Sequence, residues 1–417
     1  MAKFIIHESK NLQGEIKVLG AKNAAMKMIA GTVLIKDEVI LENVPDIADV
    51  QKLIEILTQN GAQIERNGST LQIDTTNLQD KDPNQKLVKK FRGSIVLIGP
   101  YLARFGHVNL PQPGGCNLGA RSIDTHIEAF KNIGAKFTRQ NELNQFSLDN
   151  NLGGEISLTE ASVTATENMI LSQVLGLKKS IIRNCATEPQ IKDLAEFLNR
   201  AGAKIEGAGT RIITIEGVEK LTGATYRVMP DPFETSTFVC LSIVTQSELK
   251  ITGCRPNDMH PFLDKIKEIG VEFETGDDYI KVYKSANLKP TEIIADIHPA
   301  FSTDMQAPMG LVLTQAEGES QITEKLFENR LGYLLELKKM GAKVEILNDR
   351  QAKIYGPSQL HGAHIESLDL RAGATMILAG LTATGETVIS DAEIVDRGYE
   401  RIDERLKNIG AKIERVQ

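Results

Sequence analysis

The chain has 417 residues, more than one hydrophobic core usually serves, so its length predicts two domains. Its net charge of −7 argues against nucleic acid or an anionic membrane as the main partner. The start of the chain lacks the apolar core of a signal peptide, and no apolar run approaches the roughly 18 residues that span a bilayer. We therefore expect a cytoplasmic protein that binds neither membrane nor nucleic acid.

The four cysteines give no sign of a metal centre. Cys116, Cys185, Cys240 and Cys254 form no C-x-x-C pair and no cluster with histidine. The sequence therefore predicts no metal site, no cofactor and no disulfide framework.

Six segments rich in small and apolar residues follow one another along the chain, and each has polar residues at its start. A segment that is apolar on all sides is typical of a buried helix. In chain order these segments are 20–34, 91–106, 161–176, 231–246, 301–318 and 369–385.

A second phrase, of the type "LKNIGAKIE", follows each of these segments. It predicts the end of an amphipathic outer helix, a glycine in the left-handed conformation, and then a strand, which in several copies continues into a hairpin. The repeated glycines are Gly61, Gly134, Gly202, Gly270, Gly341 and Gly410. Six units of about 70 residues are too long for a solenoid and favour two globular domains of α/β class with three units each. The seam falls near "YRVMPDPFET", where two prolines flank Asp231.

Charged and polar side chains recur where these helices are predicted to begin. Helix N-termini offer unpaired N–H groups, so added lysine and arginine predict sites for phosphate or carboxylate groups. The buried helices begin with Lys22 and Asn23, Arg92, Ser162 and Thr164, Asp304, and Asp369 with Arg371, and the loops before outer helices carry Arg121, Arg330 and Arg397.

Each of these residues also has a structural interpretation. A lone arginine at such a junction is more often a surface charge or the partner of a nearby carboxylate. Asp304 follows Ser302 and Thr303, so a helix-capping role is as consistent with the sequence as a catalytic one. Cys116 lies in "PQPGGC", a loop with glycine freedom, where it is either a small buried hydrophobe or a reactive thiol.

Eight motifs, in order over essentially the whole chain, resemble the UDP-N-acetylglucosamine 1-carboxyvinyltransferase family of enolpyruvyl transferases. They are "LGAKNAA", "NVPDIADV", "PGGCNLGAR", "SVTAT", "FSTDMQA", "FENR", "DLRAGA" and "DRGYERID". The resemblance implies two inside-out α/β barrels of three repeats each, with buried helices and a substrate cleft between them. It also implies discontinuous domains, 22–229 and 1–21 with 230–417.

The resemblance implies transfer of the enolpyruvyl group of phosphoenolpyruvate to the 3′-hydroxyl of UDP-N-acetylglucosamine, with release of phosphate and without a metal. The phosphate contacts expected by match are Lys22, Arg121 and Arg397, with Asn23 beside them and Arg330 and Arg371 near the carboxylate. Asp304 matches the carboxylate that takes the hydroxyl proton, and Cys116 matches the thiol that protonates the methylene carbon.

The same resemblance assigns residues to the sugar nucleotide. The positions expected to line that site are Arg92, Arg121, Ser122, Ile123, Asp124, Thr125, Ser162, Val163, Thr164 and Leu326, and Asp369 completes the substrate-binding set. The chain departs from the family pattern at Ala48, Lys27, Ser122, Thr164 and Tyr333, where lysine, proline, proline, glycine and histidine are usual.

Two alternatives stand beside this interpretation. A 5-enolpyruvylshikimate-3-phosphate synthase shares the architecture and the donor, but the "GAKNAA" and "PGGC" phrases argue against it. A non-catalytic UDP-sugar-binding regulator would be expected to lack Cys116, Asp304 or Arg397, and all three residues are present.

Overall fold

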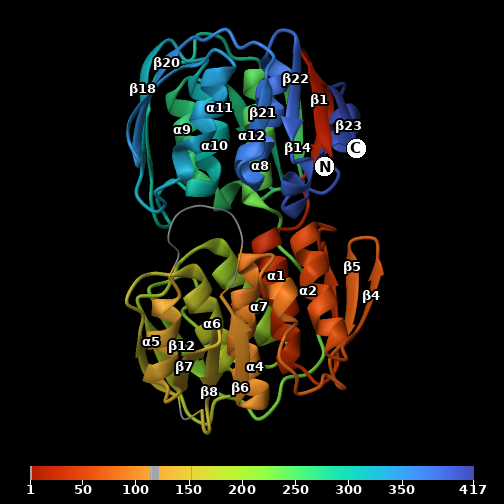
Figure 1. Ribbon diagram of the computed structural model, residues 1–417, viewed down its shortest axis with the longest axis vertical. Coiled ribbons are helices and arrows are strands. Elements are labelled where there is room, and N and C mark those ends of the chain that lie inside the picture. The colour runs from red at the N-terminus through yellow and green to blue at the C-terminus, as the bar shows by residue number, and fades with distance from the viewer. Residues whose placement is uncertain (1, 113, 115–121, 152) are drawn as a thin grey trace. The chain divides into compact units, whose positions relative to one another are not determined.

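The computed structural model describes residues 2–112, 114, 122–151 and 153–417 (Figure 1). These residues form two compact units. The N-unit contains residues 20–112, 114, 122–151 and 153–229, and the C-unit contains residues 2–19 and 230–417. The predicted boundaries of independently folding domains, 22–229 and 1–21 with 230–417, stay a prediction.

Six helices occupy the interior of the two units. They are α1 (Lys22–Gly31), α4 (Ile98–Phe105) and α6 (Val163–Gln173) in the N-unit, and α8 (Pro232–Val244), α10 (Thr303–Leu313) and α12 (Leu370–Thr382) in the C-unit. Every residue of α12 except Thr382 is buried. Short 3-10 segments precede or follow some helices: η1 (Thr32–Leu34), η2 (Arg92–Leu97), η3 (Pro256–Asp258), η4 (Arg330–Gly332) and η5 (Ala392–Arg397). The prediction of buried helices is confirmed.

A second set of helices is amphipathic and half-buried. It comprises α2 (Ala48–Gln59), α5 (Asp124–Asn132), α7 (Pro189–Arg200), α9 (His260–Glu268), α11 (Tyr333–Lys339) and α13 (Ile402–Lys407), and a short α3 (Gln85–Val88) lies between the first two repeats. The six repeated glycines follow these helices with φ between 90° and 101°. Glycine adopts this left-handed backbone without strain, so the repeated phrase specifies a helix end, as predicted.

Three sheets belong to the N-unit. Their strand orders are β13 (Thr225–Arg227), β3 (Glu38–Glu42), β5 (Thr70–Asp74), β4 (Gln63–Asn67); β6 (His107–Pro111), β8 (Leu143–Ser147), β7 (Lys136–Gln140); and β9 (Gly154–Ser157), β10 (Ser180–Arg183), β12 (Ile212–Glu216), β11 (Lys204–Glu206). In each sheet the hairpin after the repeated glycine pairs antiparallel with the strand that follows the buried helix.

Three further sheets belong to the C-unit. Their orders are β2 (Gln13–Lys17), β14 (Glu248–Thr252), β16 (Tyr279–Val282), β15 (Phe273–Thr275); β17 (Glu292–Ala295), β18 (Gly318–Glu324), β20 (Gln351–Gly356), β19 (Lys343–Asn348); and β21 (His364–Glu366), β22 (Glu386–Ser390), β1 (Lys3–His7), β23 (Lys412–Val416). In the last of these sheets, β1 lies between β22 and β23, in the place that the second hairpin strand takes in the other sheets.

The chain passes from one unit to the other after β2 and again after β13. The strand before α1 is β2, and it pairs in parallel with β14 of the C-unit. The strand before α8 is β13, and it pairs in parallel with β3 of the N-unit. Each crossover therefore leads directly into the N-terminus of a buried helix.

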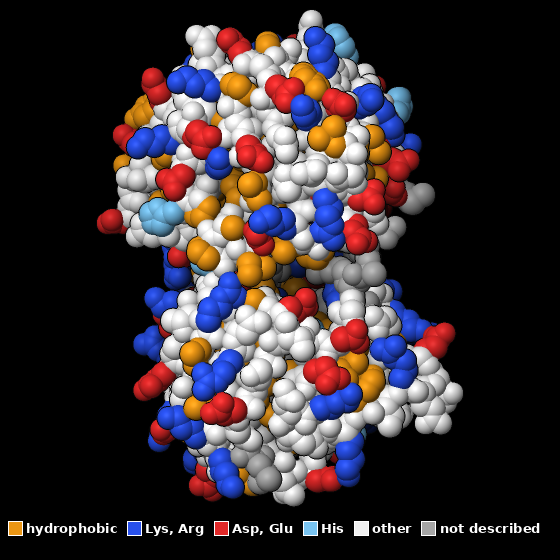
Figure 2. Space-filling view, turned by 90° about the vertical axis from the view of Figure 1, so that its left-hand side faces the viewer, with side chains coloured by type: hydrophobic (Ala, Val, Ile, Leu, Met, Phe, Trp, Pro, Cys, Tyr) orange, Lys and Arg blue, Asp and Glu red, His pale blue; other side chains and the backbone are white. Residues whose placement is uncertain are grey.

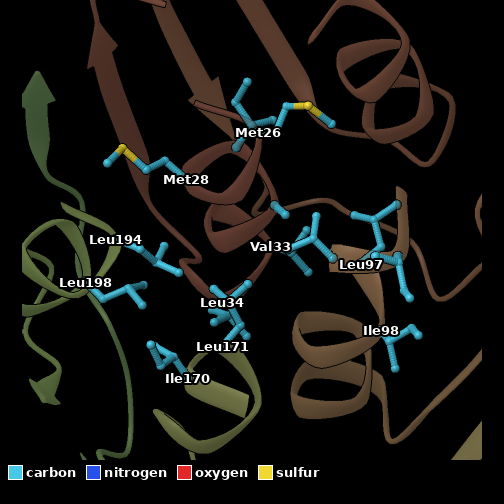
Figure 3. Packing of buried hydrophobic residues seen from close by; sticks show 14 of the residues in the cluster. Met26, Met28, Val33, Leu34, Leu97, Ile98, Ile170, Leu171, Leu194 and Leu198 are labelled. Carbon is cyan, nitrogen blue, oxygen red and sulfur yellow. The ribbon is translucent and has the colours of Figure 1, made fainter. Parts of the chain in front are cut away.

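Buried hydrophobic residues fall into two clusters, one in each unit. Figure 3 shows part of the N-unit cluster, to which α1 contributes Met26 and Met28, η1 contributes Leu34, and α6 and α7 contribute Leu171 and Leu198. The helices thus form the centre and the sheets the outside, so the predicted α/β class with two three-repeat units and buried helices is confirmed. Among the described residues no helix is both long and apolar enough to cross a membrane.

Candidate functional site

A cluster of alternating charges lies at the N-terminal ends of the three buried helices of the C-unit. It consists of Asp231, Asp304, Arg330, Asp369 and Arg371, and we call it the Asp304 cluster. Arg330 donates from Nη2 to Oδ1 of Asp304 at 2.9 Å, and its Nη1 lies 3.4 Å from Oδ2 of Asp369. Arg371 contacts Oδ2 of Asp304 through Nε at 3.4 Å and Oδ2 of Asp231 through Nη2 at 3.8 Å. One side chain from each helix start thus enters a single network.

Helix capping separates Asp304 from the other two carboxylates. Asp231 caps α8 by accepting from the backbone N–H groups of Phe233 and Glu234, and Asp369 caps α12 by accepting from those of Arg371 and Ala372. In α10 the capping side chain is Ser302, whose Oγ accepts from the N–H of Asp304 at 3.3 Å. Asp304 is therefore not the cap of its helix, and its carboxylate is directed to the two arginines.

The guanidinium plane of Arg371 contacts aromatic rings in addition to the carboxylates. Its guanidinium carbon lies 4.9 Å from the ring centre of Phe233 and 5.3 Å from that of Tyr399, and the side chain is only 3% exposed. Although burial alone lowers the pKa of Arg371, Tyr399 and the carboxylates of Asp231 and Asp304 hold that pKa above its ordinary value. Its Nη1 has no hydrogen-bond partner among the described protein groups, so one buried donor is left for a ligand.

Arg330 is equally buried, with 3% of its side chain exposed. Burial by itself lowers the pKa of Arg330, but Asp369, Asp304 and Glu324 more than offset this, so the pKa lies above its ordinary value. Asp304 is 29% exposed. The arrangement places one accessible carboxylate between two inaccessible, permanently charged guanidinium groups.

Glu324 supports this arrangement, and it was not predicted as a site residue. It is fully buried and accepts from Oγ1 of Thr303 at 2.7 Å and from the N–H of Leu326 at 2.8 Å. Burial raises the pKa of Glu324, while these hydrogen bonds lower it. The predicted substrate residue Leu326 is thus fixed through its backbone, and its side chain is half-buried.

Arg397 belongs to the C-unit. It ends η5, two residues before Tyr399, and is half-buried. Arg397 thus lies in the same short segment as Tyr399, the residue whose ring contacts Arg371.

The N-unit holds the other predicted residues. Lys22 is the first residue of α1, with Asn23 after it, and the Nζ of Lys22 lies 2.8 Å from Oδ2 of Asp49. Both predicted residues are half-buried at the helix N-terminus, where anions are favoured. Asp49 was not predicted as a site residue.

The residues matched to the sugar nucleotide are connected within the N-unit. Arg92 donates from Nη2 to the carbonyl of Ser122 at 3.1 Å, and Oγ of Ser122 accepts from the N–H of Asp124. Thr125 forms hydrogen bonds with the side chains of Thr159 and Glu160, which lie two and three residues before Ser162 in the sequence.

The residues matched to the sugar nucleotide differ in solvent exposure. Ser162 caps α6 through the N–H of Ala165, and Val163 and Thr164 form its first turn, all three half-buried. Asp124 is exposed, whereas Ile123 is 2% exposed and packs in the core, so its side chain faces other protein groups.

Cys116 and Arg121 lie outside the described residues. The three described cysteines are buried and free. Burial raises the pKa of Cys185 to about 12 and that of Cys254 to about 11, and it also raises the pKa of Cys240. These three thiols are structural hydrophobes. Among the described residues no group of three or more His, Cys, Asp or Glu side chains could hold a metal ion.

Three of the sequence departures have a clear place in the structure. Lys27 is buried in α1 and lies 3.4 Å from Oε2 of the buried Glu167 of α6. Tyr333 is buried at the start of α11 against Gly310 of α10. Ala48 is the first residue of α2, directly before Asp49.

The whole chain matches known proteins. Residues 6–406 match the family model described as EPSP synthase (3-phosphoshikimate 1-carboxyvinyltransferase). The chain is 39% identical, over all of both chains, to UDP-N-acetylglucosamine 1-carboxyvinyltransferase 2 of Clostridium tetani. It is 41% identical, over 99% of each chain, to UDP-N-acetylglucosamine 1-carboxyvinyltransferase 1 of Caldanaerobacter subterraneus subsp. tengcongensis.

The chain belongs to the UDP-N-acetylglucosamine 1-carboxyvinyltransferase family. The resemblance inferred from the eight motifs is confirmed, and the chain is a transferase of that family. Solved structures share the fold: the enolpyruvyl transferase NikO from Streptomyces tendae aligns with a TM-score of 0.91 at 24% identity, covering 100% of this chain and 99% of that chain. EPSP synthase from Acinetobacter baumannii aligns with a TM-score of 0.78 at 17% identity over all of both chains.

Proposed function

We propose that this transferase moves the enolpyruvyl group of phosphoenolpyruvate to the 3′-hydroxyl of UDP-N-acetylglucosamine and releases inorganic phosphate. Within a member of this family, the observation that carries the chemistry is Asp304, an accessible carboxylate held by Arg330 and Arg371. The reaction would be the first committed step of peptidoglycan synthesis, and we place it in the cytoplasm.

The proposed reaction is an addition to phosphoenolpyruvate followed by elimination of phosphate. The sugar hydroxyl oxygen bonds to C2 of phosphoenolpyruvate, its proton passes to Asp304, and the methylene carbon gains a proton from Cys116, which gives a tetrahedral ketal. The thiolate of Cys116 then takes a proton back from the new methyl group, which restores the double bond as the C2–O bond to phosphate breaks, and Asp304 returns the hydroxyl proton to the departing phosphate. Overall the hydroxyl proton leaves with the phosphate, and the thiol and carboxylate return to their starting forms.

The two arginines affect how Asp304 would act as a proton acceptor. Neighbouring guanidinium groups favour the ionised carboxylate, so Asp304 is ready to accept a proton but is a weak base. A weak base removes the hydroxyl proton only as the new C–O bond forms. Proton transfer and attack are therefore expected to be concerted.

Binding of the donor is assigned to cationic groups. Lys22, Arg121 and Arg397 are proposed to hold the phosphate, with Asn23 beside them. Arg330 and Arg371 are proposed to face the carboxylate, and the unpartnered Nη1 of Arg371 supports this assignment. Because the electrophile is carbon rather than phosphorus, fixed cations suffice and no metal is required by the chemistry.

The acceptor is assigned to the connected groups of the N-unit. The proposed contacts are Arg92, Arg121 to Thr125, Ser162 to Thr164, and Leu326 with Asp369 from the C-unit. Ile123 would contribute through its backbone, because its side chain is buried in the core.

Phosphate release is the assay for the proposed function. Purified protein, without added metal, is mixed with phosphoenolpyruvate and either UDP-N-acetylglucosamine or shikimate 3-phosphate. Release with the sugar nucleotide alone supports the proposal, and release with shikimate 3-phosphate alone would favour the synthase alternative. Binding of UDP-N-acetylglucosamine without release from either mixture would favour the non-catalytic regulator and contradict the proposal.

A matched pair of variants tests the assigned carboxylate. Asp304→Ala is expected to lower kcat by at least about 1000-fold, a typical size for loss of a proton acceptor that also orders neighbouring charges. Asp296→Ala removes an aspartate of the same unit whose side chain bonds to Lys325 and to the N–H of Ile297, and it should retain activity.

A further inference from the structure

Lys22, Asp49 and Lys52 form a compact ionic cluster in the N-unit. The Nζ of Lys22 lies 2.8 Å from Oδ2 of Asp49, and the Nζ of Lys52 lies 3.6 Å from Oδ1 of the same carboxylate. Two ammonium groups thus contact the two oxygens of one carboxylate.

Asp49 is the rigid member of this cluster. Its side chain is 2% exposed, compared with 12% for Lys22 and 24% for Lys52. It lies in the first turn of α2, where the helix dipole favours an anion, and the residue before that helix provides no side-chain cap. Helix packing therefore fixes the carboxylate before any ligand arrives.

Lys22 is flexible by itself, since its side chain has four rotatable bonds. A charge-assisted hydrogen bond to a buried carboxylate restricts that freedom in advance. An ammonium group carries three N–H donors, and its contact with Asp49 fixes where that group lies. Asp49 can thus orient the ammonium that the proposed function assigns to the substrate phosphate.

Lys52 balances the charge of the carboxylate. An isolated carboxylate beside a phosphate would repel it, but the cluster of two lysines and one aspartate carries a net positive charge. Lys52 therefore reduces the electrostatic repulsion between the Asp49 carboxylate and a bound phosphate.

We propose that Asp49 is the positioning residue of Lys22. The inference rests on the proposed function, in which Lys22 holds the phosphate of phosphoenolpyruvate. It predicts that loss of the Asp49 charge misplaces Lys22 during the reaction rather than simply weakening donor binding.

The kinetic test compares Asp49→Asn with two matched variants. Asp49→Asn should lower kcat about 10- to 100-fold, the scale expected when a reacting geometry loosens by about 1 Å. The KM for phosphoenolpyruvate should change less, because a repelling charge is lost together with the orientation. Asp49→Glu, which restores the carboxylate, should recover part of kcat. Glu55→Gln removes an exposed carboxylate of the same helix, which bonds only to Gln59 among the described contacts, and should have no effect.

A second readout does not depend on activity. Reductive methylation followed by peptide mass spectrometry reports how readily each lysine amine reacts. Loss of its carboxylate partner should make Lys22 react several-fold faster in Asp49→Asn than in the unsubstituted protein or in Glu55→Gln. Lysines far from the cluster, such as Lys204, should react at one rate in all three proteins.

These two readouts separate the inference from the proposed function. If the unsubstituted protein releases no phosphate, the proposed function fails, while methylation still decides whether Asp49 holds Lys22. Unchanged kcat and unchanged Lys22 methylation in Asp49→Asn would overturn the inference. If that variant melts more than about 10 °C below the unsubstituted protein, Lys22 methylation is compared at a temperature at which both proteins are folded. Unchanged Lys22 reactivity there would still overturn the inference.

Discussion

The guanidinium of Arg330 bridges two carboxylates, with Nη2 2.9 Å from Oδ1 of Asp304 and Nη1 3.4 Å from Oδ2 of Asp369. Only a planar group with several fixed donors spans both partners. The bridge ties the start of α10 to the cap of α12, so the position of the proposed proton acceptor depends on Arg330.

Arg330→Lys should therefore lower kcat/KM by about 10- to 100-fold, because an ammonium cannot maintain both contacts. Steady-state phosphate release measures the change. Arg350→Lys is the matched control, since Arg350 bonds to the carbonyl of Lys325 in the same unit and is 41% exposed. Equal losses in both variants would show that the effect is not specific to the bridge.

The ring and the hydroxyl of Tyr399 are expected to have separate effects. The ring lies 5.3 Å from the guanidinium carbon of Arg371, and the hydroxyl bonds to Oγ1 of Thr237 at 2.8 Å and also interacts with Arg371. Tyr399→Phe keeps the ring and removes only the hydroxyl contacts, so it should lose less activity than Tyr399→Ala, which leaves Arg371 without one face and should lose at least about tenfold more. Measured kcat/KM values that fall equally in both variants would contradict this role of the ring.

The buried pair of Lys27 and Glu167 predicts a pH dependence of stability. Burial raises the pKa of Glu167 to about 7, with Lys27 opposing this shift. Because the folded-state pKa lies above the unfolded value of 4.5, the folded protein retains a proton that the unfolded chain releases. The contribution of Glu167 to stability is thus greatest below pH 4.5 and declines as the pH rises to about 7.

Glu167→Gln should remove that decline. The free energy of unfolding, measured with urea at pH 5 and pH 7.5, should fall less between these values in Glu167→Gln than in the unsubstituted protein. Glu128→Gln, which removes a 52% exposed carboxylate paired with Lys131, is the control. A Glu167→Gln protein with the unchanged pH dependence would contradict the prediction.

Two glycines should respond differently to alanine. Gly270 has φ of +90° and no atom within 4 Å of an added Cβ, so Gly270→Ala should cost only about 1 kcal/mol of backbone strain. At Gly310 the added Cβ would lie 2.1 Å from Oη of Tyr333, so Gly310→Ala should destabilise by more, about 1–3 kcal/mol.

Urea unfolding of the two variants provides the measurement. Tyr333→Phe should recover part of the loss in Gly310→Ala, because it removes the clashing oxygen. Equal destabilisation in both glycine variants would contradict the packing argument.

Cys116 should be the thiol that reacts first. The described cysteines are buried with raised pKa values, so a maleimide should modify them slowly in the folded protein. Peptide mass spectrometry after brief labelling is expected to find the adduct on Cys116. Faster labelling of Cys185, Cys240 or Cys254 would contradict the assignment.

The repeat pattern predicted most of the fold. Each repeated glycine required a left-handed backbone, so six copies located six helix ends, and apolar composition on all faces identified the buried helices. The use of β1 to complete the last sheet was not predictable from periodicity, because it pairs residues from opposite ends of the chain.

The candidate site was predicted less completely. Asp304, Arg330, Asp369 and Arg371 stood at predicted helix starts, and the structure connects them. Asp49 and Glu324 were missed because each is recognisable only through its partner, and nothing in the local sequence shows which distant lysine or backbone N–H it meets. Which residue caps α10 could be decided only from the structure, since Ser302 and Asp304 are both capable of the role.

The position of bond cleavage distinguishes enolpyruvyl transfer from phosphoryl transfer. Phosphoenolpyruvate labelled with ¹⁸O in the oxygen that bridges C2 and phosphorus is turned over with UDP-N-acetylglucosamine, and the released phosphate is analysed by mass spectrometry. Enolpyruvyl transfer breaks the C–O bond, so the account predicts that the label leaves with the phosphate and that the sugar gains an enolpyruvyl ether. Unlabelled phosphate, with the ¹⁸O retained on the three-carbon product, would show P–O cleavage and contradict the account.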